Sequence, residues 1–310
     1  MASKLALRQY IPLPLHPAGD FDHGDVYLES GRVFVANTKA CTVEVIDGEN
    51  LCHLATIPDC PEASGVLAAQ DETLIFAAAR GAGKLLVIDP ITLGVLRTVA
   101  VGARPNGLAW DSLRKHLLVA DVQDNSARLV DPHTGEVMAS VELPGRPRWA
   151  VYHQASDRFL VNIREPACVA VLSADPFVLV ERFPVFSPGP HGLDLDQDGR
   201  RAFVACDAST VVTLDLATGR ERARVPIAGS PDAIWHNHQR DRLYVAIAHI
   251  GILNEAPGVV NVVNTQSMTV EEQMTTEAGA HTTAYDARRQ RLYVFLPSCR
   301  VAVYEEREME

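Results

Sequence analysis

Three histidines and one aspartate recur at corresponding points of an internal repeat, and they are the first candidates for chemistry. They are His23, His191, Asp232 and His281. Neutral imidazoles together with a carboxylate form a typical ligand set for a divalent metal such as Zn²⁺, Fe²⁺, Mn²⁺ or Ni²⁺. A coordination position left open by the protein would hold water or substrate. The pattern therefore predicts a metal centre that could act on a small molecule.

Two further side chains extend this candidate site. His249 follows a strand of the same repeat unit as Asp232 and is the candidate acid or base outside the coordination shell. Arg148 occupies the repeat position of the metal-ligand candidates and is the candidate anchor for an anionic substrate. Arg80 and Arg164 follow corresponding strands and are expected to assist. The alternative is that these groups only line a polar, solvent-filled channel.

The repeat itself predicts how these residues are positioned. Its anchors, at positions 23, 64, 106, 148, 191, 232 and 281, recur every 41 to 49 residues. Each unit contains four short apolar segments separated by turns rich in Gly, Pro, Asp and Asn. Four strands in a period of this length are typical of a propeller blade. We therefore predict an all-β fold, a seven-bladed β-propeller with four antiparallel strands per blade.

Both ends of the chain contribute to the predicted closure of the ring. The last unit supplies three strands, and residues 5–13 precede the first anchor and read as a fourth. Pairing the N-terminal strand with the last blade would close the ring and remove an exposed sheet edge. The whole chain, residues 1–310, is accordingly predicted to form one propeller domain.

The order of the blades brings the candidate ligands together. His191, Asp232, His281 and His23 belong to blades 5, 6, 7 and 1, which are neighbours once the ring closes. Because each lies at the start of an innermost strand, all four are expected at one mouth of the central channel. The long last spacing comes from residues 250–258, an insertion that could cover this mouth as a lid.

Another pair of histidines is expected to do no chemistry. His236 and His238 follow the innermost strand of blade 6 and are predicted to lie in a solvated turn on the opposite face.

Several segments resemble the YVTN-repeat β-propellers. The resemblance rests on residues 243–246 (Leu-Tyr-Val-Ala), 87–89 (Val-Ile-Asp), 101–105 (Val-Gly-Ala-Arg-Pro) and 34–37 (Phe-Val-Ala-Asn), the last being the nearest match to the Tyr-Val-Thr-Asn motif. It covers nearly the whole chain and implies the propeller fold. Lactonases and virginiamycin B lyases are distant fold analogues that use channel-mouth residues. The resemblance does not fix the activity, because such folds host unrelated functions.

Composition narrows the classes of partner. The 310 residues carry a net charge of −11 and no cluster of Lys or Arg, which argues against nucleic acid and an anionic membrane surface as partners. We recognise no signal peptide and no apolar run long enough to span a membrane, so a cytoplasmic location is expected. The six cysteines form no CxxC pair and are expected to be reduced thiols.

Three functions remain open from the sequence. The first is a metal-dependent enzyme acting on a small molecule, a lyase or a lactone or ester hydrolase. The second is a non-catalytic scaffold for protein partners, which the aromatic content of 6% disfavours. The third is a sensor or store for a metal or small molecule at the same mouth. The substrate, the metal and the oligomeric state are not specified by the sequence.

Overall fold

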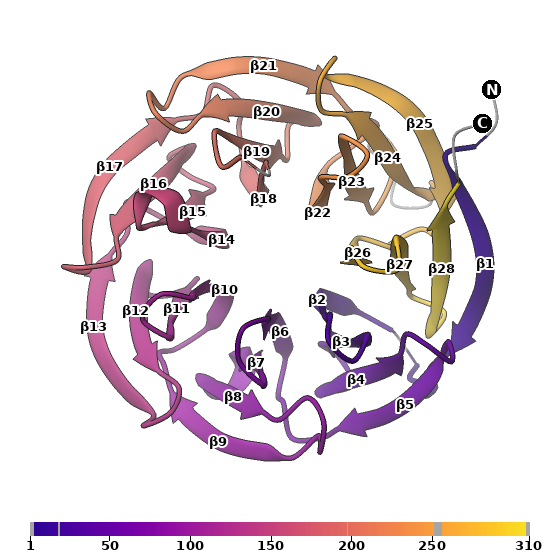
Figure 1. Cartoon of the computed structure of the whole chain (residues 1–310), viewed down its shortest axis with the longest axis horizontal. Coiled ribbons are helices and arrows are strands. Elements are labelled where there is room, and N and C mark those ends of the chain that lie inside the picture. The colour runs from indigo at the N-terminus through magenta and orange to yellow at the C-terminus, as the bar shows by residue number, and fades with distance from the viewer. Residues whose placement is uncertain (1–2, 18, 197, 251–255, 308–310) are drawn as a thin grey trace.

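The computed structural model describes residues 3–17, 19–196, 198–250 and 256–307. Strands in these ranges form seven sheets, each with four antiparallel strands, arranged around a central axis (Figure 1). The predicted seven-bladed β-propeller is therefore confirmed. Within each blade the strands follow one another outward, so that the first strand faces the channel and the last forms the rim.

Blades 1 to 4 follow the order of the chain. Their strands are β2 (Phe21–Tyr27), β3 (Arg32–Asn37), β4 (Thr42–Asp47) and β5 (Cys52–Ile57); β6 (Ala63–Ala69), β7 (Leu74–Ala79), β8 (Lys84–Ile88) and β9 (Val95–Ala100); β10 (Pro105–Asp111), β11 (His116–Asp121), β12 (Ser126–Asp131) and β13 (Glu136–Glu142); β14 (Pro147–His153), β15 (Arg158–Ile163), β16 (Cys168–Ser173) and β17 (Val178–Pro184).

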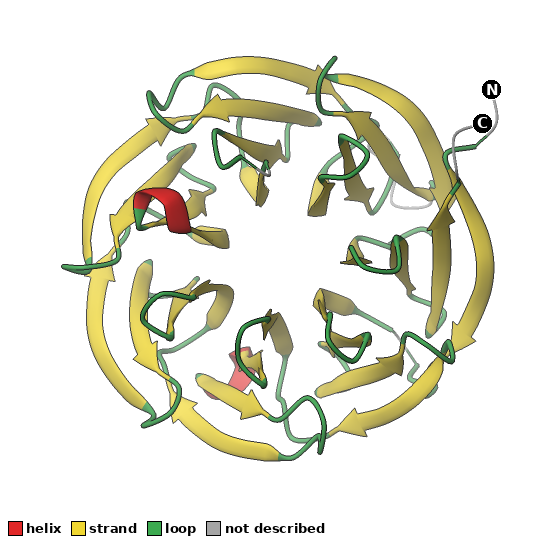
Figure 2. Ribbon diagram, viewed as in Figure 1, coloured by secondary structure: helices red, strands yellow, loops and turns green. Residues whose placement is uncertain are grey.

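Blades 5 to 7 continue this order, and blade 7 takes its outermost strand from the N-terminus. Their strands are β18 (Pro190–Leu195), β19 (Arg201–Cys206), β20 (Thr210–Asp215) and β21 (Glu221–Pro226); β22 (Pro231–Asn237), β23 (Arg242–Ile247), β24 (Gly258–Asn264) and β25 (Thr269–Thr276); β26 (Thr282–Asp286), β27 (Arg291–Leu296), β28 (Arg300–Glu306) and β1 (Leu5–Pro12). Two short 3₁₀ helices, η1 (Arg80–Ala82) and η2 (Gln154–Ser156), lie in connections of blades 2 and 4 (Figure 2).

Burial explains why the strands differ in sequence. The second strands of the blades are apolar on both faces, as in β7, in which all six residues are buried. Such strands are covered by a neighbouring blade on each side, so they read as continuous hydrophobic runs. The outermost strands, such as β13, instead alternate between exposed and half-buried residues because one face meets solvent. The hydrophobic core thus lies between the blades.

The last blade closes the ring as predicted. β1 pairs with β28 from Leu5↔Glu306 to Pro12↔Arg300. The carboxylate of Glu306, with a side chain only 1% exposed, is bonded by Arg242 and by the Tyr244 hydroxyl of blade 6. These bonds attach the end of β28 to the neighbouring blade, and β1 covers the outer edge of β28.

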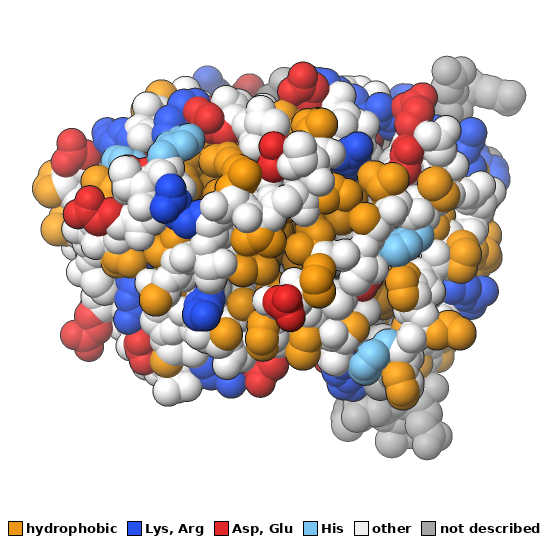
Figure 3. Space-filling model, turned by 90° about the horizontal axis from the view of Figure 1, so that it is seen from below, with side chains coloured by type: hydrophobic (Ala, Val, Ile, Leu, Met, Phe, Trp, Pro, Cys, Tyr) orange, Lys and Arg blue, Asp and Glu red, His pale blue; other side chains and the backbone are white. Residues whose placement is uncertain are grey.

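The outer surface has a mixed character. Figure 3 shows one side of the ring, where acidic and basic side chains are interspersed with hydrophobic ones. All six cysteines lie in the described ranges and are free thiols, as expected. Within those ranges, no helix has the length and apolar character needed to cross a membrane.

Candidate functional site

A β-bulge at the start of each innermost strand sets the geometry of the channel mouth. In blades 1 to 6 the register shifts there by one residue, so that two residues of the inner strand lie opposite one residue of its partner. In each of these inner strands, one residue follows the first paired position. We call these residues and their counterpart in blade 7 the mouth ring. Its members are Asp22, Ser64, Asn106, Arg148, His191, Asp232 and, at the corresponding place in blade 7, His281.

This register moves His23 out of the predicted ring. Phe21 pairs with Asn37 as Pro190 pairs with Cys206, so Asp22 is the equivalent of His191 and His23 lies one position further along. A shift of one residue turns the side chain to the other side of the strand. The His23 ring accordingly packs against Trp149, with ring centroids 4.1 Å apart, while its Nδ1 lies 3.0 Å from Asp22 Oδ1.

His191 is held between two carboxylates. Its Nε2 lies 3.1 Å from Asp232 Oδ1, and its Nδ1 lies 3.2 Å from Asp207 Oδ1. Because both partners are acceptors, both ring nitrogens must donate, which makes the ring an imidazolium. Burial opposes this charge, but Asp232 and Asp207 overcome it and raise the pKa of His191 to about 9. His191 is therefore a cation at neutral pH.

Asp232 is shared between two histidines. His281 Nε2 lies 3.7 Å from Asp232 Oδ2, and His281 Nδ1 donates to the Gly279 carbonyl oxygen at 2.8 Å. Burial alone would raise the pKa of Asp232, but His191 and His281 hold it well below its usual range. In turn the Asp232 carboxylate raises the pKa of His281 against the effect of burial. The structure therefore brings three of the four predicted ligands, His191, Asp232 and His281, into one group.

The predicted assisting arginines neutralise further carboxylates of the mouth. Arg164 Nη2 lies 2.7 Å from Asp207 Oδ2. Arg80 Nη1 lies 3.3 Å from Asp22 Oδ2 and also donates to Asn106 Oδ1 at 3.3 Å. Both side chains lie on the same face as the mouth ring, as their positions after second strands predict. They act here as partners of acidic side chains.

Arg148 differs from these arginines. It is half-buried, and its guanidinium has no hydrogen bond or ion pair with any residue that the structure describes. Burial, together with the positive charges of Arg146 and Arg164, lowers its pKa, and Asp232 and Asp207 offset only part of this effect. Arg148 is therefore a cation of the mouth ring without a counter-ion among the described residues.

A cavity of about 370 Å³ opens at this mouth between blades 5, 6 and 7. Its lining includes His191, Asp232, His281 and His249. The Nδ1 atom of His249 is buried and has no partner among the described residues. The predicted lid begins beside it, and its two ends meet where Ile250 N donates to Pro257 O at 3.2 Å. Residues 251–255 of that insertion lie outside the described residues.

The predicted metal centre receives no support from this geometry. In the described ranges, no group of three or more His, Cys, Asp or Glu side chains is arranged to hold a metal ion. The His23 ring packs against Trp149, and both nitrogens of His191 are occupied by carboxylates. A metal ligand would need a free nitrogen lone pair at His191.

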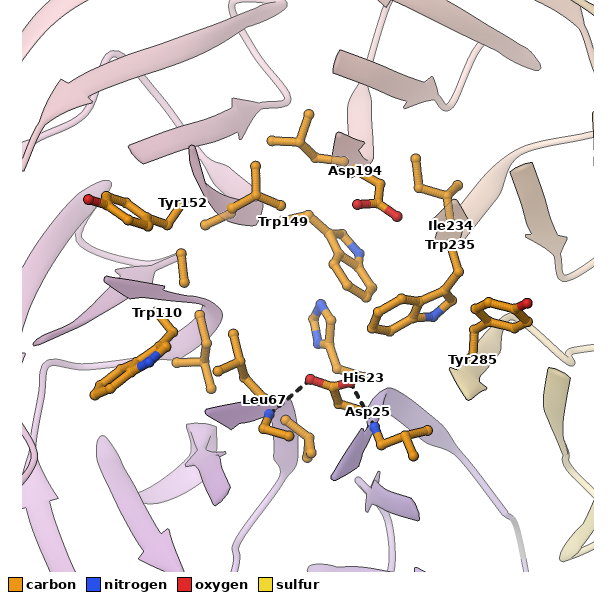
Figure 4. A pocket seen from close by; sticks show the side chains of 18 of the residues that line it. His23, Asp25, Leu67, Trp110, Trp149, Tyr152, Asp194, Ile234, Trp235 and Tyr285 are labelled. Atoms are coloured by element: carbon orange, nitrogen blue, oxygen red, sulfur yellow. Dashed lines mark hydrogen bonds between the residues drawn. The ribbon is translucent and has the colours of Figure 1, made fainter. Parts of the chain in front are cut away.

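The opposite end of the channel holds a second cavity, of about 380 Å³, which we call the aromatic chamber (Figure 4). Here the prediction for His236 was wrong. It lies in β22, is only 7% exposed, and its ring nitrogens face Leu195 O at 3.2 Å and Thr265 Oγ1 at 3.3 Å. Its ring also contacts that of His238, with centroids 4.5 Å apart. Both histidines line the chamber, but His238 is exposed and lies in the turn after β22, as predicted.

Sequence reasoning missed several residues of the two sites. Asp207 follows the second strand of blade 5, as Arg80, Arg164 and His249 follow theirs, so its position carried the same signal. Asp22 was missed because the sequence aligns its neighbour His23 with His191. Both histidines are followed by glycine, so they look equivalent. The aromatic chamber had no such signal, because its side chains are recognised only from their convergence.

Comparisons with known proteins support the fold alone. No family model matches the chain, and no curated protein matches it. Solved structures do match, and they include a hydrazine synthase from Kuenenia stuttgartiensis, with a TM-score of 0.82 and 14% sequence identity. That similarity covers 95% of this chain and 97% of the other. At this identity the likeness establishes the seven-bladed architecture, and the YVTN-repeat resemblance stays a prediction.

Proposed function

We propose that the mouth ring binds a small molecule with a carboxylate or another anionic group, and that Arg148 is its anchor. The observation that carries this proposal is the half-buried guanidinium, which has no counter-ion in the part of the chain that the structure describes. A buried charge is costly unless it is paired, and a bound anion would supply the missing partner. Guanidinium groups also match carboxylates in geometry, since they donate two parallel hydrogen bonds.

The other charges of the mouth support this assignment. Asp22 pairs with Arg80, Asp207 with Arg164, and Asp232 with His191. Three carboxylates are thereby matched by three cations, and Arg148 remains in excess. Arg146, exposed on the same inter-blade connection, adds positive charge. An anionic ligand would therefore enter a locally positive site on a protein whose net charge is −11.

We propose His249 as the group that exchanges a proton with such a ligand. It lines the cavity, and its Nδ1 is unpartnered among the described residues. His191 is less suited, because both its nitrogens are held by carboxylates. Proton transfer beside a bound carboxylate is the chemistry of a lyase or of a lactone or ester hydrolase, and these are the reaction classes that we propose to test. Without turnover, the same site is a sensor or store for the anion.

Binding can be measured by isothermal titration calorimetry with acetate, succinate, citrate and inorganic phosphate. Arg148→Gln should weaken the best of these ligands at least about tenfold, because one charge-assisted pair is lost. Arg148→Lys should retain part of the affinity. The matched control is Arg182→Gln, on the exposed outer strand β17, where the described residues offer no ion pair. Failure of all four anions to bind, or equal binding by Arg148→Gln, would refute the proposal.

A metal-assisted version of this function is tested separately. Elemental analysis of protein purified without a histidine tag should show less than about one metal ion in ten chains, because His191 is occupied by two carboxylates. Stoichiometric metal that disappears in His281→Gln would instead establish the metal centre predicted from the sequence. Turnover on lactone and lyase substrate panels, lost in His249→Gln with ligand affinity retained, would separate an enzyme from a sensor.

A further inference from the structure

The aromatic chamber gathers all the tryptophans of the protein. The chain contains three, Trp110, Trp149 and Trp235, and each lines this cavity together with Tyr152 and Tyr285. Figure 4 shows the rings of Trp149 and Trp235 beside that of His23 at the centre of the chamber. The Trp149 and Trp235 rings meet edge to face, with centroids 6.3 Å apart. Their faces and edges offer a binding surface for a flat or apolar group.

Two carboxylates enter the same chamber, and neither has a cationic partner among the described residues. Asp25 and Asp194 occupy equivalent positions of blades 1 and 5, and each accepts one amide bond from the next residue and one from the neighbouring blade. These bonds are Val26 N to Asp25 Oδ1 at 2.7 Å, Ala68 N to Asp25 Oδ2 at 2.9 Å, Leu195 N to Asp194 Oδ1 at 2.8 Å and His236 N to Asp194 Oδ2 at 2.7 Å. Burial raises the pKa of each carboxyl to about 7.

The hydrogen bonds from Asp25 and Asp194 to the neighbouring blades do not by themselves explain why these positions carry carboxylates. At the equivalent position the other five blades carry a side chain without a carboxylate, and they pack as well. Those residues are Leu67, Ala109, Val151, Trp235 and Ala284. Two acidic groups that feel each other's charge, placed in an apolar cavity, are unfavourable unless something positive joins them.

His23 supplies an independent sign of a ligand. It is only 6% exposed, and its Nδ1 lies 3.0 Å from Asp22 Oδ1 and 3.2 Å from Ser64 O. Both neighbours are acceptors, so Nδ1 is the donor. The other nitrogen, Nε2, is buried, has no partner among the described residues, and belongs to a ring that lies in the chamber against Trp149. In a neutral ring Nε2 is an acceptor that awaits an N–H donor.

We propose that the aromatic chamber is a second ligand site, and that it takes a small organic amine in its protonated form, with a flat or apolar body. The ammonium group would donate to His23 Nε2 and face the carboxylates of Asp25 and Asp194. Its carbon skeleton would lie on the indoles of Trp149 and Trp235, whose π-faces also attract a cation. A cavity of about 380 Å³ accommodates a molecule of this kind.

The other titratable groups of the chamber do not oppose a cation. Burial lowers the pKa of His236 to about 4, with His238 adding to the effect, and burial also lowers the pKa of His238. Both imidazoles are therefore neutral at neutral pH. Arg201, whose charge acts on His236, is paired with Asp196 through an Nε–Oδ2 distance of 2.8 Å. The chamber thus presents acidic and aromatic groups without a free positive charge among its lining residues.

The test uses three probes of nearly equal shape and different charge. They are 2-phenylethylamine, 2-phenylethanol and 3-phenylpropanoate, titrated into the full chain at pH 8 while tryptophan emission is recorded. Because every tryptophan lines the chamber, the whole emission reports on it. We expect the amine to bind at least about tenfold more tightly than the alcohol, and the carboxylate to bind more weakly than both.

Substitutions then locate the charge recognition. Asp25→Asn and Asp194→Asn should each weaken the amine about tenfold and leave the alcohol unchanged. Glu181→Gln, on exposed strand β17, removes one negative charge elsewhere and should change neither. If one aspartate variant fails to fold by circular dichroism, the other carries the test, and the probe series on the unsubstituted chain is independent of both. Equal binding of the three probes, or amine affinity unaltered in a folded aspartate variant, would overturn the proposal.

Discussion

The two ends of the channel both bury carboxylates, yet they leave them in opposite states. At the mouth ring, burial works against ionisation of Asp232, but imidazolium groups hold its pKa well below its usual range. In the aromatic chamber none of the described residues supplies a cation to Asp25 or Asp194, and burial raises the pKa of each to about 7. Desolvation acts in the same direction at both ends. The charge of the neighbour decides whether it prevails.

The boundary between these ends follows one position of the repeat. Directly after the mouth ring, blades 2, 3 and 5 carry glycine, whereas blades 1 and 4 carry His23 and Trp149. Those two rings contact each other, and both line the aromatic chamber. The bulge that turns the ring side chains toward the mouth therefore turns the next side chains toward the chamber.

The largest loss of stability is expected from a substitution that displaces the backbone at the mouth. A Cβ added at Gly192 would lie 2.3 Å from the Asp232 carbonyl oxygen, closer than packed atoms can approach. Gly192→Ala should therefore lower the free energy of unfolding by roughly 3 kcal/mol, as overpacking does. Urea denaturation measures this loss. It should also move Asp232 and so weaken anion binding at the mouth, while amine binding in the chamber changes less.

Gly94→Ala is the matched control, because the only neighbour of its added Cβ would be Thr92 Oγ1 at 3.5 Å. Its free energy of unfolding should stay within about 0.5 kcal/mol of the original chain. If Gly192→Ala lowers the free energy of unfolding no more than Gly94→Ala does, blades 5 and 6 are not tightly packed against each other at the mouth.

The ion pairs of the mouth should make stability depend on pH. The pKa of His191 is raised from 6.5 to about 9, so its contribution is complete below pH 6.5 and is lost as pH rises through 9. His191→Gln should therefore lower the free energy of unfolding by roughly 2 to 3 kcal/mol at pH 7 and by little at pH 10. Denaturation series at the two pH values measure the difference.

His133→Gln, an exposed histidine in a turn of blade 3, is the control and should show no such pH dependence. A cost for His191→Gln that is the same at pH 7 and pH 10 would mean that the imidazolium makes no net contribution.

The fold was predictable because its signals are local and repeated. Each blade is recognisable in the sequence from apolar runs such as residues 117–120, which are bounded by turn residues. Because the last unit lacks one strand, the sequence also predicts that residues 5–13 supply it. Neighbouring strands of a blade run in opposite directions, so the second strand ends on the face where the first begins. This alternation placed Arg80, Arg164 and His249 correctly at the mouth.

The site was less predictable because a single inserted residue decides which way a side chain points. The His-Gly pairs at residues 23–24 and 191–192 look equivalent, yet the pairing register shows that they differ by one position. Nor does the sequence reveal that both nitrogens of His191 are taken by carboxylates, since Asp207 and Asp232 lie 16 and 41 residues away. Side-chain convergence between blades is a property of the closed ring.

The chamber should show its pH dependence in a lower window than the mouth. The pKa of Asp25 is raised from 3.8 to about 7, so its contribution to stability is complete below pH 3.8 and is lost as pH rises through 7. Between pH 5 and pH 8 this loss should reach about 2 kcal/mol, allowing for partial exposure. In Asp25→Asn the loss should be absent, because the amide does not ionise. Urea denaturation at pH 5, 6, 7 and 8 measures both chains.

The chamber and the mouth can then be compared by the pH range in which each substitution lowers the free energy of unfolding. Asp25→Asn should be most costly at pH 5, where the carboxyl of the original chain is neutral, and the gap should narrow toward pH 8. His191→Gln should show its full cost at pH 7 and lose it only near pH 10. Adding 2-phenylethylamine should oppose the loss in the original chain, because a bound cation favours ionised Asp25. If instead Asp25→Asn grows more costly as pH rises, the carboxylate already has a cationic partner, and the two ends of the channel are electrostatically alike.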